Sequence, residues 1–172
     1  MKSNHMIRMV RAGIMTLVVG MGISATGYAI DAGSKAPDFS LPGQQGTVKL
    51  SDKSGSVVYL DFWASWCGPC KESFSWMNSM QAKYRSKGLQ IIAVNLDAKT
   101  EDAKKFLSQT PANFTIAFDA KGVNPKVYGV QGMPTSFLIG RDGKIIKQHQ
   151  GFREADRETL EKQIQTALEA KK

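Results

Sequence analysis

Two cysteines, Cys67 and Cys70, are the only cysteines in the 172 residues of the chain, and Gly68 and Pro69 separate them. They follow a strand-like apolar run at residues 57–62 and precede a segment whose apolar residues recur at helical spacing. Residues i and i+3 are neighbours on a helix surface, so their sulfur atoms can bond with little backbone movement. A Cys-x-x-Cys motif in this context predicts thiol-disulfide exchange.

A helix that begins at the motif would activate Cys67. The free N–H groups and the positive end of the helix dipole stabilise a thiolate, which is the reactive form of cysteine. A purely structural disulfide would stabilise little, because the loop it closes is very short. A structural zinc site requires four ligands, and the chain has no second cysteine pair. The redox interpretation is therefore favoured.

Asp61 is a charged residue within the apolar run, six positions before Cys67. One interpretation is a carboxylate at a strand end that faces solvent. The other is a buried acid near Cys70, where loss of hydration raises the carboxyl pKa until it exchanges a proton near neutrality. Trp66 is expected on the surface as an apolar rim for partner docking, whereas Trp63 and Trp76 are expected in the core.

Residues 1–29 have the pattern of a secretory signal peptide. Basic residues precede an uncharged, mostly apolar run at residues 12–23, and small residues lead to a cleavage site after Ala29. The alternative is an uncleaved membrane anchor, because residues 12–30 carry no charge and are nearly long enough to span a bilayer. In either case residues 30–172 are expected to form one domain.

Charge and cysteine usage limit the function classes. The chain has 23 Lys+Arg and 15 Asp+Glu, a net charge of +8, and three of the basic residues lie in the predicted signal peptide. The others are spread along the chain without a cluster interleaved with aromatics, so a nucleic-acid role is not supported. An exported protein with one reactive cysteine pair must be held by its core and must work where disulfides persist, which predicts the periplasm. His149, in a polar, edge-like strand, is assigned no role.

Hydrophobic periodicity predicts alternating strands and helices, with a hairpin at each end of the sequence. A right-handed parallel crossover is expected for the first strand-helix-strand unit, and the closing hairpin adds antiparallel strands. The fold class is therefore α/β, a mixed sheet with helices on both faces. Strands are predicted at residues 36–41, 47–50, 57–62, 89–96, 114–118, 136–139 and 144–149. Helices are predicted around residues 74–84 (ending at Gly88), 103–107 (with Thr100 as the cap), 124–128 and 160–168.

Two segments resemble the thioredoxin superfamily. Residues 61–71, DFWASWCGPCK, resemble the active-site segment of thioredoxins, and residues 132–139, GMPTSFLI, resemble their second active-site loop. The start at residues 36–39, APDF, and a strand-helix segment at residues 96–121 are absent from thioredoxin itself and resemble the TlpA/ResA/CcmG branch of exported bacterial reductases. The resemblance covers residue 36 to the end. It implies a thioredoxin-like mixed sheet with an N-terminal β-hairpin and a central strand-helix insertion.

The position within this branch follows from two departures. CcmG-type members often carry acidic residues where this chain has Ser73 and Thr135. These departures favour a TlpA-like assignment and leave Asp61 as the candidate acid.

The resemblance and thiol chemistry together imply roles for the site residues. Cys67 is expected to attack a substrate disulfide, and Cys70, one helical turn deeper, to resolve the mixed disulfide. Pro134 is expected to follow a cis peptide bond, with the backbone of Met133 pairing with the substrate as an added strand. Gly68 and Pro69 are also expected to tune the redox potential. The residues expected at the substrate-binding surface are Trp66, Gly68, Pro69, Met133, Pro134 and Thr135.

The predicted function is a periplasmic thiol-disulfide oxidoreductase that reduces protein disulfides. Two alternatives stay open: an oxidase of the same fold, and a non-catalytic capture or chaperone module for metalloprotein assembly. The Gly-Pro dipeptide within the motif resembles reducing members of the family. By the same resemblance the substrates are apocytochrome c or copper-delivery and oxidase proteins, and a membrane thiol carrier donates the electrons. No cofactor or metal is expected, and the protein is expected to be a monomer.

Overall fold

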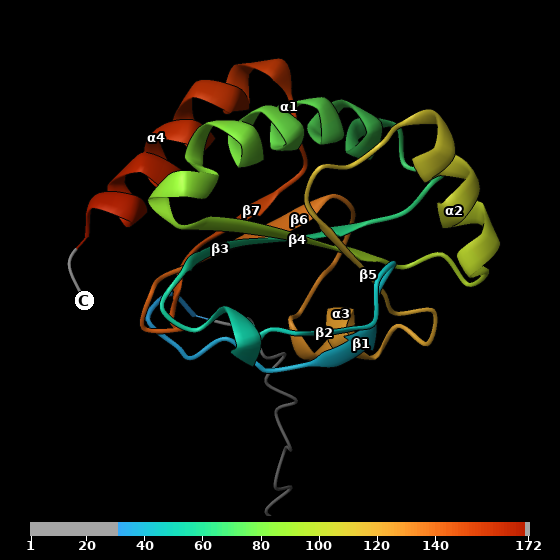
Figure 1. The fold of residues 1–172 in the computed structure, drawn as a ribbon, viewed down its shortest axis with the longest axis horizontal. Helices are drawn as coiled ribbons and strands as arrows, with labels where there is room; N and C mark the ends of the chain where they lie inside the picture. Colours follow the sequence, from blue (N-terminus) through green and yellow to red (C-terminus); the bar gives the residue numbers. More distant parts are fainter. Residues whose placement is uncertain (1–30, 171–172) are drawn as a thin grey trace, which may run out of the picture.

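The computed structural model describes residues 31–170, which fold around a five-stranded mixed sheet (Figure 1). The strand order is β5-β4-β3-β6-β7. The helices α1 and α4 cover one face, and α3 covers the other together with the hairpin β1-β2. The strands are β1 (Ser40–Pro42), β2 (Thr47–Lys49), β3 (Val57–Trp63), β4 (Leu89–Asn95), β5 (Thr115–Phe118), β6 (Thr135–Ile139) and β7 (Ile145–Gln150). The α-helices are α1 (Gly68–Tyr84), α2 (Thr100–Gln109), α3 (Val123–Val127) and α4 (Arg157–Glu169). The short 3₁₀ turns are η1 (Ser51–Lys53), η2 (Arg85–Lys87) and η3 (Glu154–Asp156).

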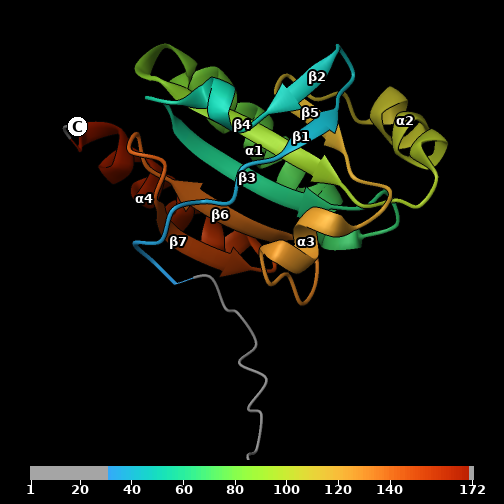
Figure 2. The ribbon, with the colours of Figure 1, turned by 90° about the horizontal axis from the view of Figure 1, so that it is seen from below.

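The central strand β3 is parallel to β4 and antiparallel to β6 (Figure 2). The outer pairs are parallel for β4-β5 and antiparallel for β6-β7. All seven residues of β3 are buried, because the sheet is covered on both faces at this strand. The predicted parallel strand-helix-strand unit and the predicted antiparallel closing hairpin are both confirmed.

Two apolar cores lie on the two faces of the sheet. Side chains alternate along a strand, so Tyr59 and Trp63 of β3 enter the core beneath α1 and α4, whereas Leu60 and Phe62 enter the opposite core. The same alternation places Asp61 on the side of α1 and α4. The N-terminal hairpin covers the opposite core, with Leu41 and Val48 as a cross-strand pair.

The first helical segment ends where the sequence predicts, whereas α2 begins differently from the prediction. The first helical segment ends at Gly88, as predicted, where φ is +97° and a left-handed residue closes η2. The predicted Thr100 cap is wrong. The helix α2 begins at Thr100 itself, the extended Lys99 is its N-cap, and no side chain caps it. Glu101 and Asp102 lie in its first turn, where negative charge suits the helix dipole.

Candidate active site

A disulfide joins Cys67 and Cys70 at the N-terminus of α1, with the two Cα atoms 5.3 Å apart. Cys67 is the N-cap residue in an extended conformation, and its Sγ accepts a hydrogen bond from the Cys70 N–H at 3.3 Å. Pro69 lies in the first turn, where its missing N–H costs nothing. Cys67 is 6% exposed and Cys70 is fully buried, so only Cys67 reaches the surface.

This geometry suits a reactive thiolate at Cys67. When the pair is reduced, an N–H donor at the helix terminus and the helix dipole both act on the Cys67 sulfur. Cys70 lies one turn further along α1 and is enclosed by the core beneath this helix. An attacking partner therefore meets Cys67 first.

Asp61 lies in the middle of β3 and is 2% exposed, which excludes the solvent-facing interpretation. Its Oδ2 has no hydrogen-bond partner among the described residues. Burial raises the pKa of the Asp61 carboxyl well above its ordinary value, because the charged form loses its hydration. The carboxyl lies on the sheet face that α1 covers, the face to which Cys70 also belongs. The predicted burial and the predicted direction of the pKa shift are confirmed.

The second active-site loop lies beside the end of β3, because Thr135 pairs with Phe62 in the sheet. The Met133–Pro134 peptide is cis, as expected. Thr135 is fully buried, and its hydroxyl donates a hydrogen bond to the Gly132 carbonyl at 2.6 Å. Its side chain therefore fixes the loop from inside and is not available for the predicted contact with substrate.

The three tryptophans occupy the environments that the sequence predicts. Trp66, next to Cys67, is 73% exposed and forms an apolar rim beside the disulfide. Trp63 of β3 and Trp76 of α1 are both buried in the core between the sheet and the helices α1 and α4.

Asp97 holds the turn before the cysteines in place, and the sequence analysis did not identify it. Its carboxylate accepts hydrogen bonds from the Ser65 N–H at 3.0 Å, the Ser65 hydroxyl at 3.1 Å and the Asn95 side-chain amide at 2.8 Å. Asp97 is 3% exposed, so these bonds compensate a buried carboxylate. The sequence did contain a signal, because the polar residues Asn95 and Asp97 follow an apolar strand. In the sheet, the end of this strand lies beside the end of β3.

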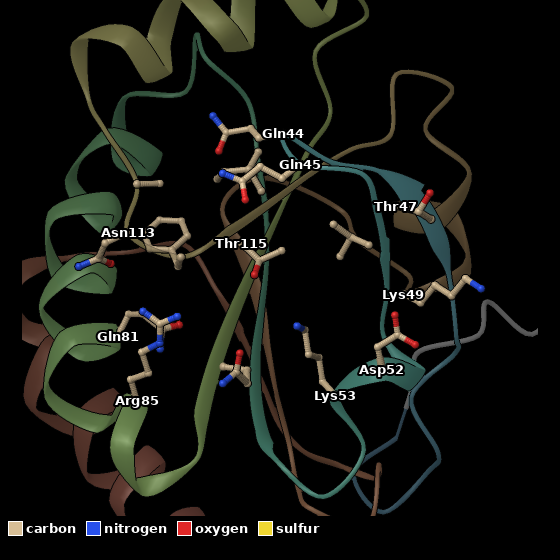
Figure 3. A pocket seen from close by; sticks show the side chains of 15 residues that line it. Gln44, Gln45, Thr47, Lys49, Asp52, Lys53, Gln81, Arg85, Asn113 and Thr115 are labelled. Atoms are coloured by element: carbon tan, nitrogen blue, oxygen red, sulfur yellow. The ribbon is translucent and has the colours of Figure 1, made fainter.

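A separate polar hollow of about 420 Å³ lies where the strands β4 and β5 begin, away from the cysteines (Figure 3). The amide of Gln81 is already used there, because it bonds the Leu89 carbonyl and the Ile91 N–H. No active-site residue lines this hollow, so the chemistry is assigned to the disulfide. The side chains lining the hollow that Figure 3 labels are Gln44, Gln45, Thr47, Lys49, Asp52, Lys53, Gln81, Arg85, Asn113 and Thr115.

Within residues 31–170, no group of three His, Cys, Asp or Glu side chains is placed to hold a metal ion. No helix in the same part of the chain has the length and apolar character needed to cross a membrane. The predicted signal peptide or anchor, residues 1–29, lies outside the described residues.

Comparison with known proteins agrees with this site. The model of the Redoxin family matches residues 31–164. The chain belongs to the Redoxin family. A ResA thiol-disulfide oxidoreductase from Bacillus cereus is 34% identical over 170 residues, which cover 95% of this chain and 97% of the relative. ResA from Bacillus subtilis is 34% identical over 146 residues, 80% of this chain and 82% of the relative.

A solved structure of a similar protein also supports thiol-disulfide chemistry for this Redoxin-family chain. The Chlorobium tepidum protein described as a thiol:disulfide interchange protein, DsbE, is 71% identical, with a TM-score of 0.80. The match covers 80% of this chain and 98% of that one. The chain is thus a thiol-disulfide oxidoreductase of the ResA/CcmG-like branch of the thioredoxin superfamily. The finer TlpA-like assignment stays a prediction.

Proposed function

We propose that this Redoxin-family chain is a periplasmic reductant of protein disulfides that cycles between the Cys67–Cys70 disulfide and the dithiol. The observation that carries the proposal is the arrangement of the pair at the start of α1. Cys67 reaches the surface at the helix N-terminus, and Cys70 is enclosed one turn deeper. In such a pair, the exposed sulfur can attack a substrate disulfide, and the enclosed sulfur can then release the substrate from the mixed disulfide.

The proposed reductive cycle passes two electrons from the cysteine pair to a substrate disulfide. The Cys67 thiolate attacks one sulfur of a substrate disulfide, forms a mixed disulfide and releases the first substrate sulfur as a thiolate. Asp61 takes the proton of Cys70, and the Cys70 thiolate then attacks the Cys67 sulfur. The second substrate thiolate leaves, and the enzyme holds the intramolecular disulfide. Two electrons have passed to the substrate, and a thiol donor, proposed to be a membrane thiol carrier, returns the enzyme to the dithiol.

The substrate polypeptide is proposed to bind at the loop before β6 and at Trp66. Within the described residues, the N–H and the carbonyl of Met133 make no backbone hydrogen bond, so both are available to an added strand. The exposed indole of Trp66 offers apolar contact area beside the disulfide. Apocytochrome c and copper-delivery or oxidase proteins are the proposed substrates, by resemblance to the TlpA/ResA/CcmG branch.

The direction of the reaction is tested by the reduction potential. Equilibration of the purified protein with glutathione redox buffers should give a potential well below that of the periplasmic oxidant DsbA, which is about −120 mV. Catalytic reduction of insulin disulfides by dithiothreitol should be accelerated by the wild type. A potential near that of DsbA would instead support the oxidase.

Turnover is separated from capture by the single-cysteine variants. Cys70→Ser leaves Cys67 as the only thiol of the chain, so any mixed disulfide with a substrate protein must involve Cys67. We expect adducts that dithiothreitol releases, with turnover lost. Cys67→Ser is the matched control and should form far fewer adducts, because Cys70 is enclosed. Full insulin reduction by Cys70→Ser would contradict the two-cysteine cycle.

A further inference from the structure

A row of polar side chains crosses the sheet beneath α1 and α4, from the buried acid to the surface. In the register of the sheet, Asp61 of β3 lies opposite Ser136 of β6, and Ser136 lies opposite His149 of β7. Directly opposed residues of antiparallel strands share one face, with Cβ atoms about 4.5–5.5 Å apart. The three strands are adjacent in the sheet (Figure 2), so the three residues lie in one row on the face of Asp61, although the Asp61 Oδ2 and the His149 Nε2 have no hydrogen-bond partner among the described residues.

The hydroxyl of Ser136 is oriented by a neighbour. The Tyr59 O–H donates a hydrogen bond to the Ser136 Oγ at 2.8 Å, and both residues are buried. Burial raises the pKa of Tyr59, with the charge of Asp61 adding to the effect, so the phenol keeps its proton. Because Ser136 accepts from Tyr59, its own proton is available to Asp61 on one side or to His149 on the other.

Exposure increases along the row. Asp61 is 2% exposed and Ser136 4%. The His149 side chain is 27% exposed as a whole, although its Nε2, which lies 3.6 Å from the Oδ2 of Asp156, is itself buried. An imidazole can accept a proton at one nitrogen and release one at the other, and its ordinary pKa lies near neutrality. His149 therefore lies where the buried row meets solvent.

The charged groups around His149 come from each element that packs near it. Asp156 of η3 accepts hydrogen bonds from Arg153, and this contact, with a smaller contribution from His149, lowers the pKa of Asp156. Arg157, at the start of α4, pairs with Glu154 at 3.0 Å. On the α1 side, the residue that packs against Tyr59 is Trp76, which does not titrate. On the strands, the titratable groups on this face are Tyr59 and Asp61 of β3 and Lys147 of β7.

We propose that Ser136 and His149 form the path by which the proton of Asp61 passes between the buried site and solvent. This inference rests on the proposed function, because it assumes that Asp61 takes the proton of Cys70. Asp61 then donates its proton to the Ser136 Oγ as the Ser136 proton moves to His149. The imidazolium then releases a proton to solvent. The path carries one proton per cycle and changes no covalent bond between heavy atoms.

The test measures how fast Cys70 resolves a preformed mixed disulfide between Cys67 and thionitrobenzoate, by stopped-flow absorbance from pH 5 to 9. General acid–base catalysis contributes about a hundredfold or more, so Asp61→Asn should slow resolution on that scale. Ser136→Ala and His149→Gln should each slow it by about tenfold, a part of that effect.

A matched control separates a proton path from a general electrostatic effect. Lys147→Gln removes a charge from the same face of β7, two residues before His149, and should leave both rate and profile unchanged. Alkylation of Cys67 in the reduced protein should be the same in Ser136→Ala, His149→Gln and Lys147→Gln.

The outcomes distinguish this inference from the proposed function. If Asp61→Asn slows resolution but Ser136→Ala and His149→Gln do not, the path is wrong and the role of Asp61 stands. If Lys147→Gln slows resolution as much as His149→Gln does, the path is also wrong. An unchanged rate in Asp61→Asn would overturn the acid–base step of the proposed function itself. In the Asp61→Asn background, His149→Gln should have no further effect, and an additive loss would contradict the path.

Discussion

At the scale of the residue, the buried carboxyl of Asp61 makes the stability of the protein depend on pH. The native pKa is raised above the unfolded value of about 3.9. Between these two values the native state holds a proton that the unfolded chain has released, so the free energy of unfolding falls as pH rises. Each unit by which the pKa is raised corresponds to about 1.4 kcal/mol.

Asp61→Asn should therefore stabilise the fold at neutral pH, because an amide does not ionise. Urea unfolding at a series of pH values should show the variant and the wild type converging near about pH 4 and diverging above it, with the variant more stable. Asp52→Asn, at an exposed aspartate in η1, is the control and should show no such divergence. A variant that is less stable than the wild type at pH 7 would show that the carboxylate is ionised and stabilised in the native state.

Asp97 leads to a second prediction at this scale. Asp97→Ala leaves the Ser65 N–H, the Ser65 hydroxyl and the Asn95 amide without their acceptor. An unsatisfied buried donor costs about 1–3 kcal/mol, so urea unfolding should show a loss of at least that size. Alkylation of Cys67 should also slow or lose its sharp pH dependence, because the turn that places this cysteine at the N-cap is released. An exposed aspartate in the first turn of α2, Asp102, supplies the control, since Asp102→Ala should leave both measurements nearly unchanged.

The residues of the candidate site and of the proposed proton path differ in how far the sequence could identify them. Cys67 and Cys70 were identifiable because local spacing alone defines their geometry. Asp61 could be placed in a strand, but its two interpretations were separated only by the cover that α1 provides. His149 was given no role, because its position opposite Ser136 depends on the register between β6 and β7, which no local pattern encodes.

At the scale of the element, strand and helix identities follow from periodicity, while their ends do not. The continuous apolar run of β3 predicted a strand buried on both faces, and all its residues are buried. The start of α2 was misplaced because capping depends on the backbone conformation of Lys99, which is extended. Thr135 was expected to face the substrate, but it pairs with Phe62 and its side chain lies in the opposite core.

The helix α2 is attached to the domain through aromatic contacts near the active-site turn. The Phe106 ring lies 5.0 Å from that of Trp63 and 5.1 Å from that of Phe74, measured between ring centroids. Such pairs contribute about 0.5–1.5 kcal/mol each beyond the area that they bury. The helix α2 therefore packs against the end of β3 and against α1, the two elements that flank the cysteines.

Phe106→Ala should cost about 2–3 kcal/mol in the free energy of unfolding by urea, less than the roughly 3–5 kcal/mol of fully buried aromatic truncations, because Phe106 is only partly buried. Amide exchange should accelerate most in α2. Lys105→Ala, on the exposed side of the same helix, keeps the aromatic contacts and should change neither measurement. Equal exchange in α2 for the wild type and Phe106→Ala would show that other contacts hold the helix.

At the scale of the whole molecule, one arginine ties together segments that are far apart in the sequence. The Arg141 guanidinium, in the β6-β7 turn, donates to the carbonyls of Gly55 at 3.0 Å, Lys87 at 3.1 Å and Leu168 at 3.2 Å. These carbonyls belong to the loop before β3, to η2 and to the last turn of α4. The left-handed Gly88 beside them leaves room for the side chain, since a Cβ there would lie 3.0 Å from the Arg141 Nη1.

Arg141→Ala should destabilise the whole domain by about 2 kcal/mol, because three carbonyls lose a charged donor. The contact lies at the sheet end where β3 begins, whereas the cysteines follow the end of β3, so the rate of Cys67 alkylation should not change. Arg141→Lys should recover only part of the loss, since one ammonium cannot reproduce a planar fork with three acceptors. Lys144→Ala removes an exposed cation from the same turn and should leave the midpoint of urea unfolding unchanged. If Arg141→Lys and the wild type unfold at the same urea concentration, the positive charge alone accounts for the contribution of Arg141. The three hydrogen bonds of the guanidinium would then not be what stabilises the domain.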